Sequence, residues 1–217
     1  MKKRLIVGIT GASGTIYGVR LLEILREIGG IETHLVASEA VERTTSEEGG
    51  RPITEIKALA DVVHDDRDVG ASIASGSFRT MGMIVAPCSV KTMSSIAHSI
   101  TGSLITRAAD VVLKEHRRLV LMFRETPFHL GHLRSLTALA EMGAIIAPPI
   151  PSFYHQPQTV GDIVDQSVRR VLDLFDLDVP GIKRWKETPL PKRPLKKAHR
   201  ENEISSSVKK PTKKDKQ

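Results

Sequence analysis

Residues 7–18 read VGITGASGTIYG, and this stretch decides the expected fold. The apolar run Leu5–Ile9 leads into a loop where glycines recur every third residue, at Gly8, Gly11 and Gly14. Small residues between a strand and a helix let a backbone approach a phosphate closely, and the first amide groups of a helix attract anions. The stretch therefore predicts a strand, an anion- or nucleotide-binding loop and a helix, and the alternative is a plain strand-to-helix turn.

Short apolar runs alternate with helical patterns along the rest of the chain. The runs expected as strands are Leu5–Ile9, Thr33–Ala37, Met81–Ala86, Leu119–Phe123 and Ala144–Ala147. A helical pattern follows each run; the second covers residues 53–63 and the last covers Ile163–Leu174. Strands that alternate with helices specify a parallel sheet with helices on both faces. We therefore predict a three-layer α/β/α fold with a mainly parallel sheet.

The net charge of +7 is concentrated near the C-terminal end. Residues 183–217 contain 13 Lys or Arg against 4 Asp or Glu, whereas residues 1–182 contain 19 against 21. The basic segment is rich in proline and serine, so we expect one folded domain over residues 1–187 and a disordered basic tail over residues 188–217. Tails of this kind can bind RNA or acidic membranes. Because the basic charge does not belong to a folded face, we expect no specific nucleic-acid partner.

Apolar runs and the cysteine count indicate where the protein acts. No apolar run approaches the ~20 residues of a membrane span, so we expect none. The apolar run near the N-terminus is short and leads into the glycine loop, where a signal peptide would have a cleavage site. The one cysteine, Cys88, cannot form an intramolecular disulfide and is typical of a reducing compartment. We therefore expect a cytoplasmic protein.

The residues after the predicted strands indicate where a ligand binds. In parallel α/β sheets, ligands bind beyond the carboxyl ends of the strands. The residues at these ends are Gly11, Ala12, Ser13 and Gly14, then Ser38, then Cys88, Ser89, Val90, Lys91 and Thr92, then Arg124 and Glu125, and last Tyr154. Arginine can hold a phosphate or flavin oxygen with two parallel hydrogen bonds, and glutamate can serve as acid or base. Arg124 and Glu125 therefore suggest a site, with a structural ion pair as the alternative.

Dinucleotide binding fits this pattern poorly. The Rossmann fingerprint is G-x-G-x-x-G with an acidic residue closing the second strand, whereas here the spacing is G-x-x-G-x-x-G and Ser38 closes that strand. A mononucleotide held partly by hydroxyl groups fits better. His129 and His132 lie three residues apart without a third ligand in a known metal-binding pattern, so we expect no metal. Cys88 is expected to be a small buried residue and not a nucleophile.

The chain resembles the bacterial flavin prenyltransferases, formerly called the small subunit of 3-octaprenyl-4-hydroxybenzoate carboxy-lyase. The resemblance covers residues 3–187 and rests on the motifs RLIVGITGASG, ASGSF, PCSVKT, TRAADVVLKEHR, RETP and FYHQPQ. It implies a flavodoxin-like or Rossmann-like fold and metal-independent transfer of a dimethylallyl group from dimethylallyl phosphate to reduced FMN. It also implies a homododecamer that supplies prenylated FMN to a partner decarboxylase, in ubiquinone biosynthesis or in aromatic acid metabolism.

The resemblance also assigns roles to single residues. It implies that FMN is bound by Gly11, Ala12, Ser13, Ser38, Ser89, Val90, Lys91, Thr92 and Arg124. It implies that the prenyl donor is bound by Ser75, Gly76, Arg107, Lys114, Glu125, Tyr154, Arg170 and Trp185. The catalytic residues that it implies are Ser13, Glu125, Arg107 and Lys114. Some of these side chains are expected to come from a neighbouring subunit.

Two other functions stay open on the sequence. An FMN-dependent aromatic acid decarboxylase would release carbon dioxide without a partner. An FMN-binding carrier would bind the flavin without turnover and deliver it through the basic tail. A phosphopantothenoylcysteine decarboxylase is disfavoured, because it uses an early catalytic histidine and the early region offers only His34, inside a predicted strand.

Overall fold

The structure is a computed structural model that describes residues 3–181. The strands are β1 (Lys3–Ile9), β2 (Ile31–Ala37), β3 (Val62–Asp65), β4 (Gly82–Cys88), β5 (Arg118–Phe123) and β6 (Ile145–Ile146). The helices are α1 (Thr15–Ile28), α2 (Ala40–Glu47), α3 (Ile53–Lys57), the short 3-10 helix η1 (Ser72–Ala74), α4 (Val90–Ala97), α5 (Leu104–Lys114), α6 (Leu130–Glu141) and α7 (Val160–Asp173). The tail predicted over residues 188–217 lies outside the described residues.

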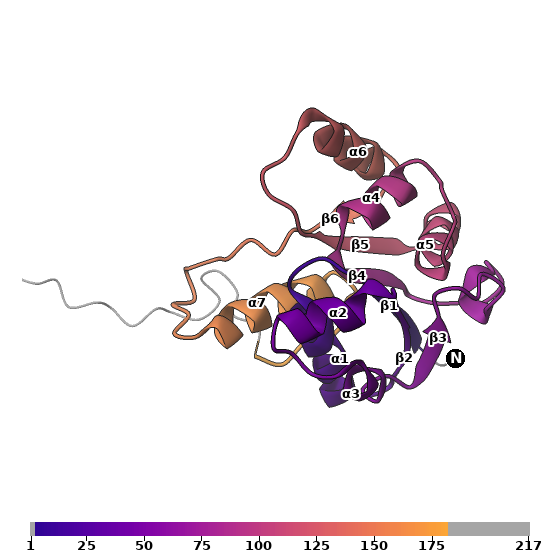
Figure 1. The fold of residues 1–217 in the computed structure, drawn as a ribbon. Coiled ribbons are helices and arrows are strands. Elements are labelled where there is room, and N and C mark those ends of the chain that lie inside the picture. The colour runs from indigo at the N-terminus through magenta and orange to yellow at the C-terminus, as the bar shows by residue number, and fades with distance from the viewer. Residues whose placement is uncertain (1–2, 182–217) are drawn as a thin grey trace, which may run out of the picture. The chain divides into compact units, whose positions relative to one another are not determined.

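The strands form one sheet in the order β3-β2-β1-β4-β5-β6. Every neighbouring pair within it is parallel, and helices cover both faces (Figure 1). This confirms the predicted three-layer α/β/α fold. The chain passes from β1 through β2 to β3 on one side and then returns to β4 on the other side of β1. The loops after β1 and β4 therefore diverge at a topological switch point, where ligands bind in folds of this type.

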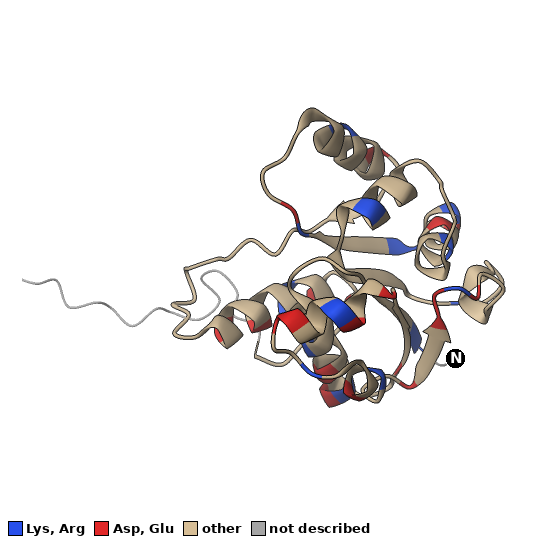
Figure 2. Ribbon diagram, viewed as in Figure 1, with Lys and Arg blue, Asp and Glu red and all other residues tan. Residues whose placement is uncertain are grey.

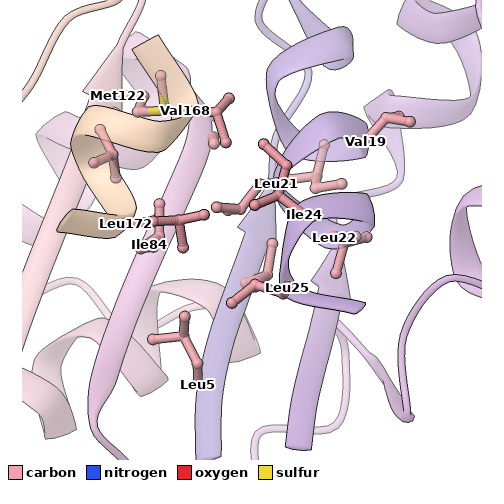
Figure 3. Packing of buried hydrophobic residues seen from close by; sticks show 14 of the residues in the cluster. Leu5, Val19, Leu21, Leu22, Ile24, Leu25, Ile84, Met122, Val168 and Leu172 are labelled. Atoms are coloured by element: carbon pink, nitrogen blue, oxygen red, sulfur yellow. The ribbon is translucent and has the colours of Figure 1, made fainter. Parts of the chain in front are cut away.

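The core consists of two apolar layers, one on each face of the sheet. Successive side chains of a strand point to opposite faces. Accordingly, Leu5 and Val7 of β1 pack with α1 and α7, whereas Ile6 between them packs with α4 and α5. Figure 3 shows the first layer, with labelled side chains of β1, β4 and β5 meeting those of α1 and α7. The strands β1, β2, β4 and β5 are buried on both sides, which explains their continuous apolar sequences.

Residues 53–63 do not form the single helix predicted from the sequence. Helix α3 ends at Lys57, and β3 pairs with β2 at the edge of the sheet. The Asp61 carboxylate accepts hydrogen bonds from the backbone N–H of Thr33 at 2.8 Å and from its hydroxyl at 2.9 Å. Pairing with β2 therefore decides the conformation of a segment whose local sequence pattern does not distinguish a helix from a strand.

Positively and negatively charged residues are interspersed over the helices and loops (Figure 2). Helices α1 and α7 are joined by Arg20 and Asp165, whose Nε and Oδ1 atoms lie 2.6 Å apart. The hydrogen bond from Arg20 holds the pKa of the Asp165 carboxyl below its usual range. Within residues 3–181, no helix is both long and apolar enough to cross a membrane.

Candidate active site

The loop between β1 and α1 adopts a conformation that requires glycine at two positions. Gly14 has a φ of 99°, in the left-handed region that glycine enters without strain. A Cβ atom on Gly11 would overlap with the Cβ of Ala40, the first residue of α2. The exposed Ser13 lies between these glycines, so its position is set by two backbone constraints.

Thr10 joins this loop to the loop after β4. Its hydroxyl donates a hydrogen bond to the carbonyl of Pro87 at 2.7 Å and accepts one from the backbone N–H of Ser89 at 2.9 Å. Thr10 is 1 % exposed, so water does not compete for these bonds. Thr10 is not among the predicted site residues, although a hydroxyl directly after an apolar strand could have indicated it.

A cavity of about 710 Å³ lies at the carboxyl ends of the strands. Five of the predicted FMN-binding residues line it, namely Gly11, Ser38, Ser89, Lys91 and Thr92. Its remaining wall includes Asp66 beside the start of α5, and the side chain of Asp66 accepts a hydrogen bond from the N–H of Ile105 at 2.9 Å. The volume is within the range of cofactor sites, and hydroxyls, an ammonium group and backbone converge on it.

The N-terminus of α4 forms one wall of this strand-end cavity. The Ser89 side chain caps the helix, because its oxygen accepts a hydrogen bond from the backbone N–H of Thr92 at 3.3 Å. The first amide groups of a helix and its dipole favour negative charge. Val90, predicted to bind FMN, is the first residue of α4 and lies in this first turn. The arrangement suits a phosphate, and the contacts of these residues with FMN stay a prediction.

Glu48 occupies the N-terminus of α1 on the other side of the glycine loop. Its carboxylate accepts hydrogen bonds from the N–H of Gly14 at 2.6 Å and from the N–H and hydroxyl of Thr15 at 3.0 and 2.7 Å. Burial alone raises the pKa of Glu48, but these bonds and one from the Ser13 hydroxyl outweigh burial and lower it. The anion that this loop binds is therefore a carboxylate of the same chain, and its predicted contact with FMN stays a prediction.

A second cavity, of about 850 Å³, adjoins the glycine loop at Ser13 and Glu48. It is larger than the strand-end cavity, but the charged groups in its walls along α1 and α7 include pairs such as Arg20 with Asp165. The strand-end cavity, which more of the predicted FMN-binding residues line, is therefore the better candidate for the flavin. Ser13 lines the second cavity.

Arg124 and Glu125 follow β5 at the same edge of the sheet. The backbone N–H of Arg124 donates to the carbonyl of Cys88 at 3.0 Å, which places it beside the end of β4. The Glu125 carboxylate accepts a hydrogen bond from the backbone N–H of Thr126 at 2.8 Å. Within residues 3–181, no ion pair joins the side chains of Arg124 and Glu125. The alternative that these two residues form a structural ion pair therefore has no support in the described part of the chain.

Tyr154 and Arg170 meet in a third cavity, of about 290 Å³, between the loop after β6 and α7. The Tyr154 hydroxyl accepts a hydrogen bond from the Gln166 side chain at 2.9 Å. Arg170 is exposed and pairs with Asp173 at 3.0 Å. The phenol and the guanidinium thus line one cavity, and their binding of one ligand stays a prediction.

Lys114, one of the predicted donor-binding residues, lies at the opposite edge of the sheet. Lys114 ends α5, and β5 begins at Arg118, so Lys114 lies beside the amino ends of the strands. The six residues of β5 span roughly 20 Å, which separates Lys114 from Arg124. Figure 1 shows α5 beside the starting end of β5. One chain therefore does not bring Lys114 to the strand-end cavity.

Ser75 and Gly76 accompany Lys114 on this side of the structure. Gly76 lies in contact with Lys114, because a Cβ on Gly76 would come within 2.9 Å of the Lys114 Nζ atom. Arg107 lies near the other end of α5, directly after Thr106 of the strand-end cavity, and pairs with Asp110 at 3.0 Å. The predicted residues thus divide into a strand-end group, with Arg107 beside it, and a group of Ser75, Gly76 and Lys114 at the far end of α5.

Three further expectations concern residues that stand apart from both groups. Cys88 is buried at the end of β4, and burial raises the pKa of its thiol, which disfavours a nucleophilic thiolate. Among residues 3–181, no group of three His, Cys, Asp or Glu side chains could hold a metal ion. Trp185 lies outside the described residues.

A doubly wound sheet with a capped helix and a glycine loop at its switch point defines a mononucleotide-binding α/β protein. A family described as Flavoprotein matches residues 1–172. The flavin prenyltransferase UbiX of Escherichia coli strain K12 is 60 % identical over 185 residues, which cover 84 % of this chain and 98 % of that protein. UbiX of Thauera aromatica is 58 % identical over 182 residues, or 84 % of this chain and 93 % of that one. The chain belongs to the flavin prenyltransferase family, as its motifs predicted.

Two solved structures share the fold over nearly their whole length. AnUbiX (PadA1), in complex with FMN and dimethylallyl pyrophosphate, matches with a TM-score of 0.84 and 46 % identity, over 87 % of this chain and 100 % of that chain. A dodecameric FMN-dependent UbiX-like decarboxylase from Escherichia coli O157:H7 matches with a TM-score of 0.82 and 50 % identity, over 84 % of this chain and 99 % of that chain.

Proposed function

We propose that this chain is a flavin prenyltransferase that joins a dimethylallyl group from dimethylallyl phosphate to reduced FMN. The prenylated FMN would serve a partner decarboxylase of aromatic or unsaturated acids. The observation that carries the proposal is the strand-end cavity, in which Gly11, Ser38, Ser89, Lys91 and Thr92 converge in a chain that is 60 % identical to a flavin prenyltransferase.

The residues of the strand-end cavity fit FMN. The capped N-terminus of α4, with Ser89 and Thr92, suits the phosphate, and Lys91 supplies a positive charge beside it. Gly11 keeps the wall next to α2 free of side-chain atoms. We assign the predicted Ala12, Val90 and Arg124 to the same site, because Ala12 and Arg124 follow β1 and β5 at this edge and Val90 begins α4.

Reduced FMN, when bound, supplies an electron-rich ring that accepts the dimethylallyl group. Tyr154 and Arg170 would hold the donor phosphate, and the Ser13 hydroxyl, which already donates a hydrogen bond to a carboxylate, would contact it from the glycine loop. When the bond between the allylic carbon and the phosphate oxygen breaks, the phosphate leaves with the electron pair. Positive side chains that meet this developing charge lower the barrier.

Glu125 is placed to move a proton. Its Oε1 atom accepts a hydrogen bond from the N–H of Thr126, which orients the carboxylate at the strand-end edge. A carboxylate there can accept a proton as the reaction proceeds, and the departing phosphate is the other possible base. A Glu125→Gln variant is therefore expected to bind FMN normally and to stall before mature product forms. Normal yields of mature product would remove Glu125 from the mechanism.

Lys114 enters this scheme through a neighbouring subunit, because it lies with Ser75 and Gly76 at the opposite edge of the sheet and a second copy of the chain would have to bring it to the strand-end cavity. Arg107 would act from the start of α5, beside the wall of that cavity. We propose that the chain assembles as a dodecamer, like the UbiX-like protein from Escherichia coli O157:H7. The guanidinium and ammonium groups then take the place that a metal ion holds in other prenyl transfers.

We also propose that the enzyme acts in the cytoplasm and that residues 188–217 form a tail separate from the domain over residues 1–187. The buried, unpaired thiol of Cys88 suits a reducing compartment. Removing residues 191–217 is expected to leave turnover unchanged, because all motifs of the family precede them. Loss of turnover on truncation would contradict this.

The activity is tested by adding dimethylallyl phosphate to the purified protein with chemically reduced FMN under anaerobic conditions. The flavin extracted afterwards is expected to be heavier than FMN by one isoprene unit, with and without a chelator. Parallel samples receive the diphosphate, or an aromatic acid without flavin reduction. Release of carbon dioxide from that acid without a partner would identify a decarboxylase instead, and flavin binding without any product would identify a carrier. Activity that is lost in chelator and restored by magnesium would overturn the metal-free scheme.

A further inference from the structure

Arg117, in the turn between α5 and β5, clamps the loop that contains Ser75 and Gly76. Its Nη1 atom donates a hydrogen bond to the carbonyl of Phe78 at 2.9 Å, and its Nη2 atom donates one to the carbonyl of Gly76 at 2.7 Å. The side chain is only 16 % exposed, so water competes weakly for these bonds. One planar guanidinium thus fixes two carbonyl groups, which the single ammonium of a lysine cannot do in the same geometry.

The clamped loop is in contact with Lys114 and Glu115. A Cβ on Gly76 would overlap with the Glu115 carboxylate, so the backbone of the loop lies directly on that side chain. Glu115 pairs with Lys114 at 2.6 Å and, through its other oxygen, with Arg117 at 3.7 Å. The hydrogen bond from Lys114 lowers the pKa of the Glu115 carboxyl. Glu115 therefore links the ammonium group to the clamp.

The far end of the loop is anchored to the sheet by Phe78. The guanidinium of Arg4, on β1, lies 4.6 Å from the centre of the Phe78 ring. The His34 ring, on β2, meets the same ring edge-on with a centroid distance of 5.2 Å. The segment from Gly76 to Phe78 is thus held by Arg117 on one side and by the sheet on the other.

We propose that Arg117 is a positioning residue for the prenyl donor. It fixes the backbone of Gly76 against Lys114, so that the loop and the ammonium group present one rigid surface to the donor phosphate. The inference rests on the proposed function, because Ser75, Gly76 and Lys114 are predicted donor-binding residues. Arg117 acts through them, since both of its terminal nitrogens are already bonded to carbonyl groups of the loop.

The test compares Arg117→Gln with Arg118→Gln. Arg118 is the matched control, because it is the next residue, carries the same charge and pairs at 2.6 Å with Asp176, away from the loop, with 45 % of its side chain exposed. Three quantities are measured for each variant and the wild type. They are the Kd of FMN, the Kd of dimethylallyl phosphate for protein holding oxidised FMN, and the KM and kcat with reduced FMN. Amide hydrogen exchange of residues 74–80 and the oligomer mass are recorded on the same samples.

For Arg117→Gln we expect the donor Kd and KM to rise about tenfold, with kcat within about threefold and the FMN Kd within about twofold of wild type. Exchange of residues 74–80 should be faster. Arg118→Gln should match wild type in all of these. Arg117→Lys, which keeps the charge beside Glu115 but offers one donor group, should give an intermediate rise of about threefold. It also serves as the test variant if Arg117→Gln does not fold.

Three results would overturn the proposal. An unchanged donor Kd in Arg117→Gln despite faster exchange of the loop would show that the clamp does not matter to the donor. An equal weakening of FMN binding, or loss of the oligomer, would assign Arg117 to folding or assembly. If the wild-type protein binds the donor but makes no prenylated flavin, the proposed function is wrong. The donor Kd values of the variants would still test whether Arg117 positions the donor-binding loop.

Discussion

The close contact between α1 and the sheet makes Gly18→Ala a sharp test of how the glycine loop is positioned. Gly18 is buried on the face of α1 that packs on β4. A Cβ there would overlap with the backbone carbonyl oxygen of Ala86 and lie 2.8 Å from the Ile9 side chain. The carbonyl belongs to a central strand and cannot rotate away. The helix, which begins at Thr15 beside the loop, would therefore have to move away from the sheet.

The size of the effect follows from two opposing terms. Overpacking of a core costs about 1–3 kcal/mol, and here the obstacle is backbone, which favours the upper part of the range. Replacing glycine by alanine inside a helix raises the free energy of unfolding by up to about 1 kcal/mol. We expect Gly18→Ala to lower the free energy of unfolding by about 2 kcal/mol, which corresponds to a Tm lower by about 6 °C in a domain of this size. FMN binding should weaken severalfold, because the loop moves with α1.

Gly161→Ala is the matched control for this prediction. Gly161 lies in the first turn of α7, is exposed, and a Cβ there would approach the Thr159 hydroxyl no closer than 3.5 Å. The same chemical change should therefore stabilise the protein by about 0.5–1 kcal/mol. Urea unfolding followed by circular dichroism, without added flavin, measures both variants. If Gly18→Ala unfolds at the same urea concentration as Gly161→Ala, the argument from close contact is wrong.

Three charged contacts give further predictions. Glu48→Ala removes the acceptor at the start of α1 and should cost about 1 kcal/mol at neutral pH. The folded-state pKa of Glu48 lies below its ordinary value of 4.5. The stability difference between wild type and Glu48→Ala should therefore persist above pH 4.5 and vanish as the pH falls through the folded-state pKa. A stability difference that grows on acidification would contradict the assignment. Asp165→Asn breaks the partly exposed pair with Arg20 and should cost about 0.5–1 kcal/mol, less in high salt. Glu47→Gln, in a fully exposed pair with Arg43, should leave urea unfolding unchanged.

Much of the fold could be predicted because its strands are buried on both faces. Continuous apolar runs such as Leu5–Ile9 and Leu119–Phe123 have few alternatives to a central parallel strand. The edge strand β3 was missed because it is half-exposed, so its residues do not show an apolar run. Whether this segment forms a strand depends on its pairing with β2 and on the hydrogen bonds to Asp61. A local sequence pattern shows neither of these contacts.

The candidate site could be predicted in part, for a topological reason. Parallel strands bring whatever follows them to one edge, so Ser38 and Ser89 could be placed together without coordinates. The position of Lys114 follows from the same rule, because a residue that precedes a strand lies at the other edge. Glu48 could not be found in this way. It reaches the glycine loop from the end of α2, and only the packing of α2 on α1 decides that contact.

The three-residue spacing of the glycines indicated a phosphate loop, but the structure shows that glycines of this stretch are also needed for close packing. Gly11 allows α2 to touch the loop, and Gly18 allows α1 to touch β4. Thr10 then ties the loop to the end of β4 through two hydrogen bonds. The elements that form the strand-end cavity are therefore held by contacts within the protein. Because those contacts need no ligand, the cavity is preorganised, and binding energy is not spent on building it. The small residues serve the ligand indirectly, by letting helices approach the sheet closely enough to fix the site.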